Sequence, residues 1–265
     1  MTEQTDSPIS DQQPAWRRPP GCVVVVLPAY NEAENIPPLL ESIDQTMYSA
    51  GMQYQLIVVD DGSDDDTASI AESYSQQMPV FVEIHEQNQG LGGTIRDGLR
   101  IAAERSNDHD LVIVMDADNT HTPGLMLRMT REIQEGADVV IASRYREGAM
   151  VRGVPIPRVF LSWGASWLMR FLFPTPGVRD YTCGYRAYRA SVLKKAFDVY
   201  GDTFVNQEGF QCMVDILLKL RRMDMVFREV PLILRYDLKG GASKMRVMRT
   251  VINTLGLLFK RRLGG

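Results

Sequence analysis

The chain is poor in the residues that build disulfide frameworks, zinc sites and membrane spans. Only three of its 265 residues are cysteine, Cys22, Cys183 and Cys212, and no two of them form a CxxC pair. An odd and widely spaced set argues against both disulfides and zinc, so we expect three structural thiols in a reducing compartment. No stretch reaches the roughly 18 uncharged apolar residues that a spanning helix requires.

Two common nucleotide signatures are also missing. No Gly-Lys-Ser/Thr follows the Gly-rich run 88–93, so that run is not a Walker loop, and the first predicted strand lacks a GxGxxG turn. A dinucleotide-binding protein is therefore disfavoured. The formal net charge of -4 likewise argues against nucleic-acid binding through bulk electrostatics.

The composition is that of a globular protein, with 45% hydrophobic and 23% charged residues. Residues 1–20 are polar and Pro-rich, without the apolar core of a signal peptide, and we predict a disordered tail. Residues 21–243 form the predicted domain. Residues 244–265 carry six basic and no acidic side chains and are predicted to form a basic amphipathic helix. We expect a cytoplasmic protein.

Short apolar runs alternate with segments of helical character along the first half of the chain. Such alternation predicts an α/β fold with a mostly parallel sheet flanked by helices. The predicted strands are 22–28, 54–63 (running into a turn), 80–85, 110–118 and 137–144. The predicted helices are 32–49, 65–77, one from the Gly-rich run to about 105, and one that ends at about 134.

The second half is less regular. We predict a loop over 145–157, an apolar helix over 159–173 and a short strand that enters a helix over 183–193. A helix with apolar periodicity is predicted over 206–222, and a strand over 225–236.

Acidic residues follow several of the predicted strands directly. Because ligands of open α/β sheets bind outside the carboxyl ends of the strands, these residues are predicted to share one crevice. Asp116 and Asp118 lie two apart after an apolar run, which places both carboxylates on the same side of an extended segment. Two such carboxylates suit Mg²⁺ or Mn²⁺, and the ion would neutralise a departing diphosphate. A solvated acidic loop is the alternative.

The second strand ends in Asp60 and Asp61. Asp60 is a candidate to accept hydrogen bonds from a base or ribose, and Tyr30 is a candidate to stack on the base. An Asx-turn that starts the next helix is the alternative. The Gly-rich run 88–93, which includes Gly93, is either a contact for the nucleotide sugar or a tight turn before a helix.

Together these segments resemble the inverting glycosyltransferases of family two, especially the branch that transfers sugars to dolichol or polyprenyl phosphate. The matching segments are LPAYNEAENI (27–36), VVDDGSDDDT (58–67), NQGLGGTIRDGL (88–99), VMDADNTHTP (114–123), ASRY (142–145) and GASK (241–244). The combination is far more specific than any one segment.

The resemblance implies a GT-A fold, a GDP- or UDP-sugar donor and a metal ion held by Asp116 and Asp118. It also implies a set of donor contacts, with Arg144 near the diphosphate or the acceptor phosphate. The donor contacts are Pro28, Tyr30, Glu32, Asp60, Gly93, Asp116, Ala117, Asp118, Arg144, Lys239, Ser243 and Lys244. Among them, Asp118 and Arg144 are the candidates for a direct part in catalysis.

One departure concerns the metal. The dolichol-phosphate branch usually reads DADLQHP and uses the Gln as a further ligand, whereas this chain has Thr120 at that position. A hydroxyl is a weaker ligand, so water could take its place. His121 matches the pattern, and a loop hydrogen bond is the alternative to a functional role.

The sequence indicates the acceptor-binding residues less specifically than the donor-binding residues. A phosphate acceptor needs cations and no general base, and the candidates besides Arg144 are Arg158, Arg179 and Arg186, with salt bridges or solvated surface positions as the alternative. Asp180 is a weaker candidate for acceptor binding. A hydroxyl acceptor would need a base, for which Glu208 is the candidate. Alternatively, Glu208 is a carboxylate in the first turn of the helix 206–222.

The apolar helix 159–173 and the basic segment 244–262 have the character of helices that lie at a membrane surface. Core packing or a homodimer interface is the alternative. The leading hypothesis is therefore hexose transfer, of mannose or glucose, to polyprenyl phosphate by a protein peripheral to the inner face of the membrane. Transfer to a hydroxyl and a non-catalytic nucleotide-binding protein remain as alternatives.

Overall fold

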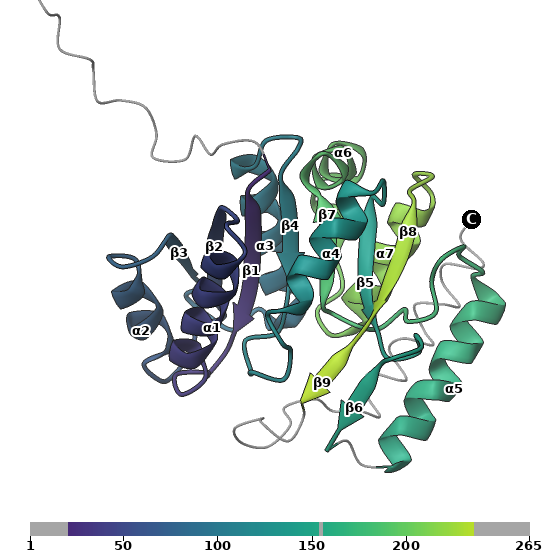
Figure 1. Ribbon diagram of the computed structural model, residues 1–265, viewed down its shortest axis with the longest axis horizontal. Coiled ribbons are helices and arrows are strands. Elements are labelled where there is room, and N and C mark those ends of the chain that lie inside the picture. Colours follow the sequence, from purple (N-terminus) through teal and green to yellow (C-terminus); the bar gives the residue numbers. More distant parts are fainter. Residues whose placement is uncertain (1–20, 154–155, 236–265) are drawn as a thin grey trace, which may run out of the picture.

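The computed structural model describes residues 21–153 and 156–235, with side chains described outside 156–162. The predicted tail 1–20, the basic segment 244–265 and the candidates Lys239, Ser243 and Lys244 lie outside these residues. Within them, a seven-stranded sheet forms the centre of the molecule (Figure 1). The strand order is β3 (Val80–Ile84), β2 (Tyr54–Asp60), β1 (Val23–Ala29), β4 (Leu111–Val114), β7 (Arg186–Arg189), β5 (Val139–Ser143) and β8 (Phe227–Pro231).

The sheet is parallel except for one strand. β7 runs antiparallel to both of its neighbours, β4 and β5, while the other pairs are parallel. The predicted mostly parallel α/β fold is therefore confirmed. All seven residues of β1 are buried, which explains its unbroken apolar sequence, because a parallel strand between two helical layers has no solvent-facing side.

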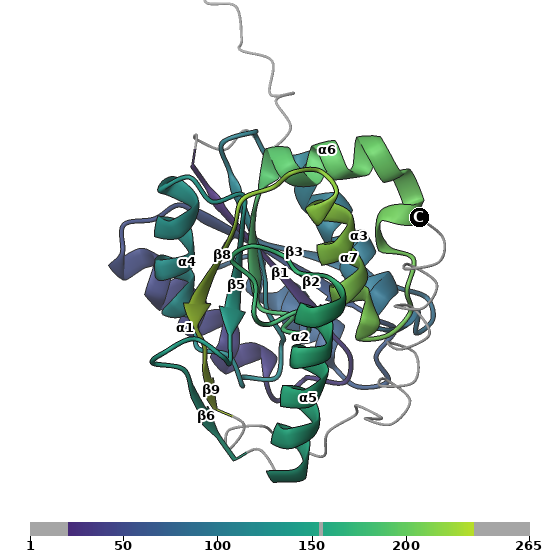
Figure 2. The same ribbon diagram turned by 90° about the vertical axis from the view of Figure 1, so that its right-hand side faces the viewer.

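Helices cover both faces of the sheet (Figure 2). α1 (Ile36–Ser49) and α4 (Leu125–Gln134) lie on one face, with α2 (Thr67–Tyr74) packed beside α1. α3 (Gly90–Arg105), α6 (Ala190–Tyr200) and α7 (Gln211–Arg221) lie on the other face. A short 3-10 helix, Gly201–Val205, joins α6 to the segment before α7.

α3 approaches the sheet closely because it carries glycine at the point of contact. A Cβ atom at Gly98 would lie 2.5 Å from Cγ1 of Val26 and 3.1 Å from Cγ2 of Val59. Any larger residue would push the helix away from β1 and β2, because a protein interior has few voids that could accept the added atoms. Gly98 thus allows α3 to pack closely against β1 and β2.

The second half differs from the sequence prediction in four places. The predicted loop 145–157 contains β6 (Met150–Arg152), and the predicted strand 225–236 is two strands, β8 and β9 (Ile233–Arg235). β6 and β9 form a separate two-stranded parallel sheet. The helix predicted from 206 begins only at Gln211, whereas α5 (Ile156–Leu172) begins earlier than predicted.

Candidate active site

The carboxyl ends of β3, β2, β1 and β4 lie next to one another, and the acidic residues follow the strands at this end of the sheet. The register pairs Ala29 of β1 with Asp60 of β2, and Val26 of β1 with Val114 of β4. The segments that follow these strands therefore start side by side. Asp60 and Asp116 are brought to the same edge, as expected of strands with parallel neighbours.

Asp60 is 1% exposed, and its carboxylate organises the turn that follows β2. One oxygen accepts the Ser63 hydroxyl at 2.5 Å and the other accepts the Ser63 backbone N–H at 3.1 Å. Gly62 lies between them at a φ of 67°, which favours glycine. The structure thus shows the Asx-type turn that the sequence left as an alternative, and a nucleoside contact at Asp60 would add to this role.

The loops after β1 and β2 are tied together by several hydrogen bonds. The Asn31 backbone N–H donates to the Ser63 hydroxyl at 2.9 Å, and the Asp64 backbone N–H donates to the Asn31 side chain at 2.8 Å. The Glu32 backbone N–H donates to the Thr67 hydroxyl at 2.8 Å. Such cross-links between two loops give a preorganised surface at the position where the resemblance places the nucleoside.

The remaining candidates on this side have separate environments. Pro28 is buried within β1, and Ala117 and Gly93 are buried as well. The Tyr30 hydroxyl lies 3.4 Å from the carboxylate of Asp64, and the Glu32 carboxylate accepts the Asn35 amide at 2.6 Å. Tyr30 is half-exposed and can offer its ring to a ligand.

Asp116 and Asp118 differ in exposure and in bonding. The Asp116 side chain is 38% exposed, and a Cβ at Gly184 would lie 3.5 Å from its Oδ1, so glycine leaves this carboxylate open on that side. Asp118 is 8% exposed, and its Oδ1 accepts the Thr120 hydroxyl at 2.6 Å and the Thr120 backbone N–H at 3.2 Å. Thr120 therefore acts as a hydrogen-bond donor to Asp118.

These two carboxylates fit a divalent ion that takes its other ligands from elsewhere. Among the described residues, no group of three or more His, Cys, Asp or Glu side chains is placed to hold a metal. Mg²⁺ is commonly bound by one or two carboxylates together with substrate phosphates and waters. The half-exposed Asp116 and the oriented Asp118 match this type of site.

His121 is buried and part of the fold of this loop. Its ring stacks on Tyr185 with centroids 4.8 Å apart, and its Nδ1 lies 3.3 Å from the Asp116 backbone nitrogen. The Thr120 carbonyl accepts the Arg235 backbone N–H at 2.9 Å, which joins the loop to β9. The loop hydrogen bond that the sequence left as an alternative is thus present.

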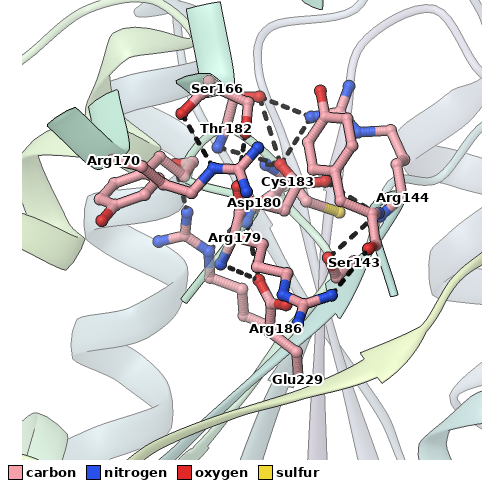
Figure 3. Close-up of polar contacts among 12 residues, drawn as sticks. Ser143, Arg144, Ser166, Arg170, Arg179, Asp180, Thr182, Cys183, Arg186 and Glu229 are labelled. Atoms are coloured by element: carbon pink, nitrogen blue, oxygen red, sulfur yellow. Dashed lines mark hydrogen bonds and ion pairs between the residues drawn. The ribbon is translucent and has the colours of Figure 1, made fainter. Parts of the chain in front are cut away.

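Arg144 forms a two-pronged ion pair with Asp180 (Figure 3). Its Nε donates to Oδ2 at 2.8 Å and its Nη2 to Oδ1 at 2.7 Å, while Nη2 also reaches the Thr182 hydroxyl at 2.5 Å. Burial alone would raise the pKa of Asp180, but the charge and hydrogen bonds of Arg144 outweigh burial and the pKa lies below its usual value. A quarter of the Arg144 side chain stays exposed for further contacts.

Glu229 of β8 supports the loop that carries Asp180. Its Oε1 accepts the backbone N–H of Arg179 at 2.6 Å and that of Asp180 at 2.7 Å. Burial raises the pKa of Glu229, although the two backbone hydrogen bonds oppose the shift. Nothing in the local sequence signals this role, since the contact spans about 50 residues.

Two predicted acceptor contacts are corrected by this geometry. Arg186 is 1% exposed, and its guanidinium donates to the carbonyls of Cys183, Met213 and Tyr181 at 2.7–2.8 Å. Its donors are used inside the fold, so the prediction of an acceptor contact is wrong. Asp180 is fully buried and holds Arg144, so it too is a supporting residue rather than a direct contact.

The other acceptor candidates are placed as follows. Arg179 is exposed, and its Nη1 lies 3.4 Å from the Tyr145 carbonyl. Arg158 belongs to α5, but its side chain lies outside the described residues. Glu208 is exposed and precedes α7, whose first turn holds no acidic residue. The alternative of a first-turn carboxylate is therefore wrong for Glu208.

α5 presents an aromatic stripe to solvent. Trp163, Trp167 and Phe171 follow one another at four-residue spacing and are 57%, 58% and 70% exposed. The rings of Trp167 and Phe171 stack with centroids 5.9 Å apart. No helix in the described part of the chain is both long and apolar enough to cross a bilayer. The stripe is thus a surface feature, and its exposure distinguishes it from core packing.

Sequence comparison finds close relatives over most of the chain. A polyprenol monophosphomannose synthase of Mycolicibacterium smegmatis is 33% identical over 236 residues, which are 88% of this chain and 84% of that protein. An undecaprenyl-phosphate mannosyltransferase of Micrococcus luteus is 31% identical over 224 residues, 84% of this chain and 87% of that protein.

Structure comparison agrees on the fold. Glucosyl-3-phosphoglycerate synthase from Mycobacterium tuberculosis, solved with Mn²⁺, UDP and phosphoglyceric acid, superposes with a TM-score of 0.61 at 23% identity. The match covers 92% of this chain and 84% of that structure. The GT-A fold implied by the sequence is confirmed. Residues 24–197 match the family model for glycosyl transferase family 2, and the chain therefore belongs to this family of glycosyltransferases.

Proposed function

We propose that this protein transfers mannose from a GDP- or UDP-sugar to a polyprenyl phosphate, with inversion at the anomeric carbon. The names of two relatives that match most of the chain support both the sugar and the acceptor. The donor part of the proposal rests on one observation. The Asp60 turn and the loop with Asp116 and Asp118 follow strands that end at the same end of the sheet.

In this reaction an oxygen of the acceptor phosphate forms a bond to the anomeric carbon. The bond from that carbon to the diphosphate breaks, and the nucleoside diphosphate leaves with the electron pair. Mg²⁺ or Mn²⁺ bound by Asp116 and Asp118 would neutralise the charge on the leaving group. The acceptor phosphate is already anionic near neutral pH, so no residue has to remove a proton from it.

Arg144 and Arg179 are the described cations best suited to the acceptor phosphate. Arg144 is held in one orientation by Asp180 and Thr182 yet stays a quarter exposed, and Arg179 is exposed nearby, bonded to Tyr145. A preorganised guanidinium loses little freedom when it binds a phosphate. The aromatic stripe of α5 offers an apolar surface for the membrane in which a polyprenyl chain resides.

A two-part assay tests the proposal. First, thermal shift with Mn²⁺ and a panel of nucleoside diphosphates identifies the base, and we expect one of GDP or UDP to raise the melting temperature. Second, labelled sugar nucleotide is incubated with polyprenyl phosphate or with the unphosphorylated polyprenol. Label on the phosphate alone supports the proposal. Binding of neither nucleotide would refute the donor half, and label on the alcohol alone would refute the acceptor half.

A further inference from the structure

The turn before α3 is held by the buried carboxylate of Asp61. Oδ1 of Asp61 accepts the Gln89 backbone N–H at 2.8 Å, and Oδ2 accepts the Gly90 backbone N–H at 2.9 Å. Asp61 is 3% exposed. A buried carboxylate that receives two backbone N–H groups at the start of a helix fixes that start firmly, since hydrogen bonds to a charged acceptor are the strong ones.

A closed ring of polar contacts reinforces this turn. His85 at the end of β3 places Nδ1 2.9 Å from Asp61 and Nε2 3.2 Å from Asp97 of α3. The Arg96 guanidinium donates to the Asp97 carboxylate at 2.8 Å and to the Gln89 side-chain oxygen at 3.0 Å. The Gln89 backbone N–H donates to Asp61, which completes the ring. The ring couples the ends of β2 and β3 to the first two turns of α3.

The first turn of α3 in turn supports the segment that carries Glu208. The Gly92 backbone N–H donates to the Glu208 carbonyl at 2.8 Å. A Cβ atom at Gly92 would lie only 1.6 Å from the Gln207 carbonyl oxygen, and one at Gly90 would lie 2.9 Å from the Glu208 carbonyl oxygen. These are backbone atoms, which cannot turn aside as a side chain can. The two segments are therefore in direct contact only because both positions are glycine.

We infer that Asp61 and Gly92 are positioning residues that fix the Gln207–Gly209 segment, which carries the candidate acceptor residue Glu208, against the first turn of α3. The inference rests on the proposed function. Asp61 directly follows Asp60, so the donor turn and the Glu208 segment share one support. Glu208 is exposed at this edge, and α7 starts three residues later. A displacement at Gly92 would move the segment while leaving the Asp60 turn in place.

Gly92→Ala tests the inference, with Gly124→Ala as the matched control. Gly124 is the residue directly before α4, close to a helix start as Gly92 is, but a Cβ there meets nothing within 4 Å. For Gly92→Ala we expect kcat, acceptor KM or both to worsen by roughly 10- to 100-fold, as for a misplacement of about 1 Å. We expect an unchanged Kd for the nucleoside diphosphate with Mn²⁺, and faster hydrogen exchange in residues 205–213. The control should match the wild type in all of these.

A second variant covers the case in which Gly92→Ala does not fold. In Asp61→Asn the amide nitrogen must face either Gln89 or Gly90, because both oxygens of the carboxylate accept backbone N–H groups. The turn should loosen, with faster exchange in 205–213 and weaker acceptor use. Nucleotide Kd is compared only for Gly92→Ala, because Asp61 also adjoins the donor turn.

Two outcomes would overturn the inference. One is wild-type exchange in residues 205–213 in a folded variant. The other is a rise in nucleotide Kd as large as the loss in acceptor use. Because hydrogen exchange needs no acceptor, it distinguishes failure of this inference from failure of the proposed function, which would show in the wild-type protein.

Discussion

The hydroxyl of Thr120 donates a 2.6 Å hydrogen bond to Oδ1 of Asp118, and both side chains are buried. The backbone N–H of Thr120 reaches the same oxygen at 3.2 Å. One oxygen of the carboxylate is thus committed to the loop. The hydroxyl orients Asp118 at the position where the resembling branch places a further metal ligand.

Removal of this hydroxyl should weaken metal binding. Thr120→Val keeps the shape of the side chain but leaves Oδ1 of Asp118 without its hydroxyl donor. We expect a roughly 10- to 100-fold loss in Mn²⁺ affinity in the presence of nucleotide, as is typical when a residue behind a ligand is lost. Thr120→Ser retains the donor and should bind like the wild type. Electron paramagnetic resonance of Mn²⁺ measures both, and equal affinity in the valine variant would contradict this role of Thr120.

The Arg144–Asp180 pair should contribute to stability as well as to the site. Asp180→Asn leaves the Arg144 guanidinium without a counter-charge, and breaking a fully buried pair costs about 3–5 kcal/mol. We expect a smaller loss in the free energy of unfolding, because a quarter of Arg144 is exposed. Denaturant titration measures the loss. The exposed pair between Lys194 and Asp108 provides the control, and Asp108→Asn should leave the midpoint unchanged.

Glu208→Gln separates the two acceptor classes. If the acceptor is a phosphate, no general base is needed and kcat should change little. If the acceptor is a hydroxyl and Glu208 removes its proton, kcat should fall by roughly 100- to 10,000-fold. Turnover at saturating donor and acceptor decides the matter, with nucleotide affinity as the check that the variant is intact. A large fall in kcat would favour the hydroxyl alternative over the proposed function.

Glu229 predicts a specific pH dependence of stability. Its folded pKa is raised, so its neutral form favours the folded state. Its contribution is fully present below the unfolded pKa of about 4.3 and is lost as the pH rises through the folded pKa. In Glu229→Gln this contribution no longer varies with pH, and the amide oxygen can still accept the two backbone N–H groups. The unfolding free energies of the wild type and Glu229→Gln should run parallel below the unfolded pKa of Glu229. Their slopes against pH should differ above it.

The aromatic stripe of α5 should anchor the protein to membranes. Trp167→Ala removes an indole from the centre of the exposed row, and indoles favour the boundary between lipid and water. We expect less protein to sediment with anionic vesicles, and an unchanged melting temperature. Tyr48→Ala, at an aromatic residue away from α5 that is 84% exposed against 58% for Trp167, is the control. Equal sedimentation of both variants and the wild type would contradict this anchoring role.

Much of the first half of the fold could be predicted from local sequence. The strands there are short apolar runs such as 23–27, and burial on both faces leaves no polar residue to obscure them. The second half was harder because its elements depend on distant partners. Around Leu232 the chain passes from the main sheet to the small one, with backbone hydrogen bonds to Ser143 and Met150. No local pattern marks that change.

Within the site, residue type predicted position better than role. Asp60 lies at the end of β2 as predicted, whereas β4 ends at Val114, so Asp116 and Asp118 lie in the loop after it and not in the predicted strand 110–118. Arg186 misled because an arginine at a strand end looks available, whereas its guanidinium donates to the nearby carbonyls of Tyr181 and Cys183 and to that of Met213, 27 residues away. The part played by Asp61 was missed for the same reason, since His85 and Gly90 lie more than 20 residues away.

The position of β7 governs the order in which the molecule can assemble. β5 pairs only with β7 and β8 within the main sheet, and both follow it in the chain. A nascent chain that ends before Arg186 can complete β3, β2, β1 and β4 but leaves β4 with an open edge and β5 without a partner. Open strand edges are templates for association with other chains. β7 therefore closes the sheet, because it covers the open edge of β4 and gives β5 its partner.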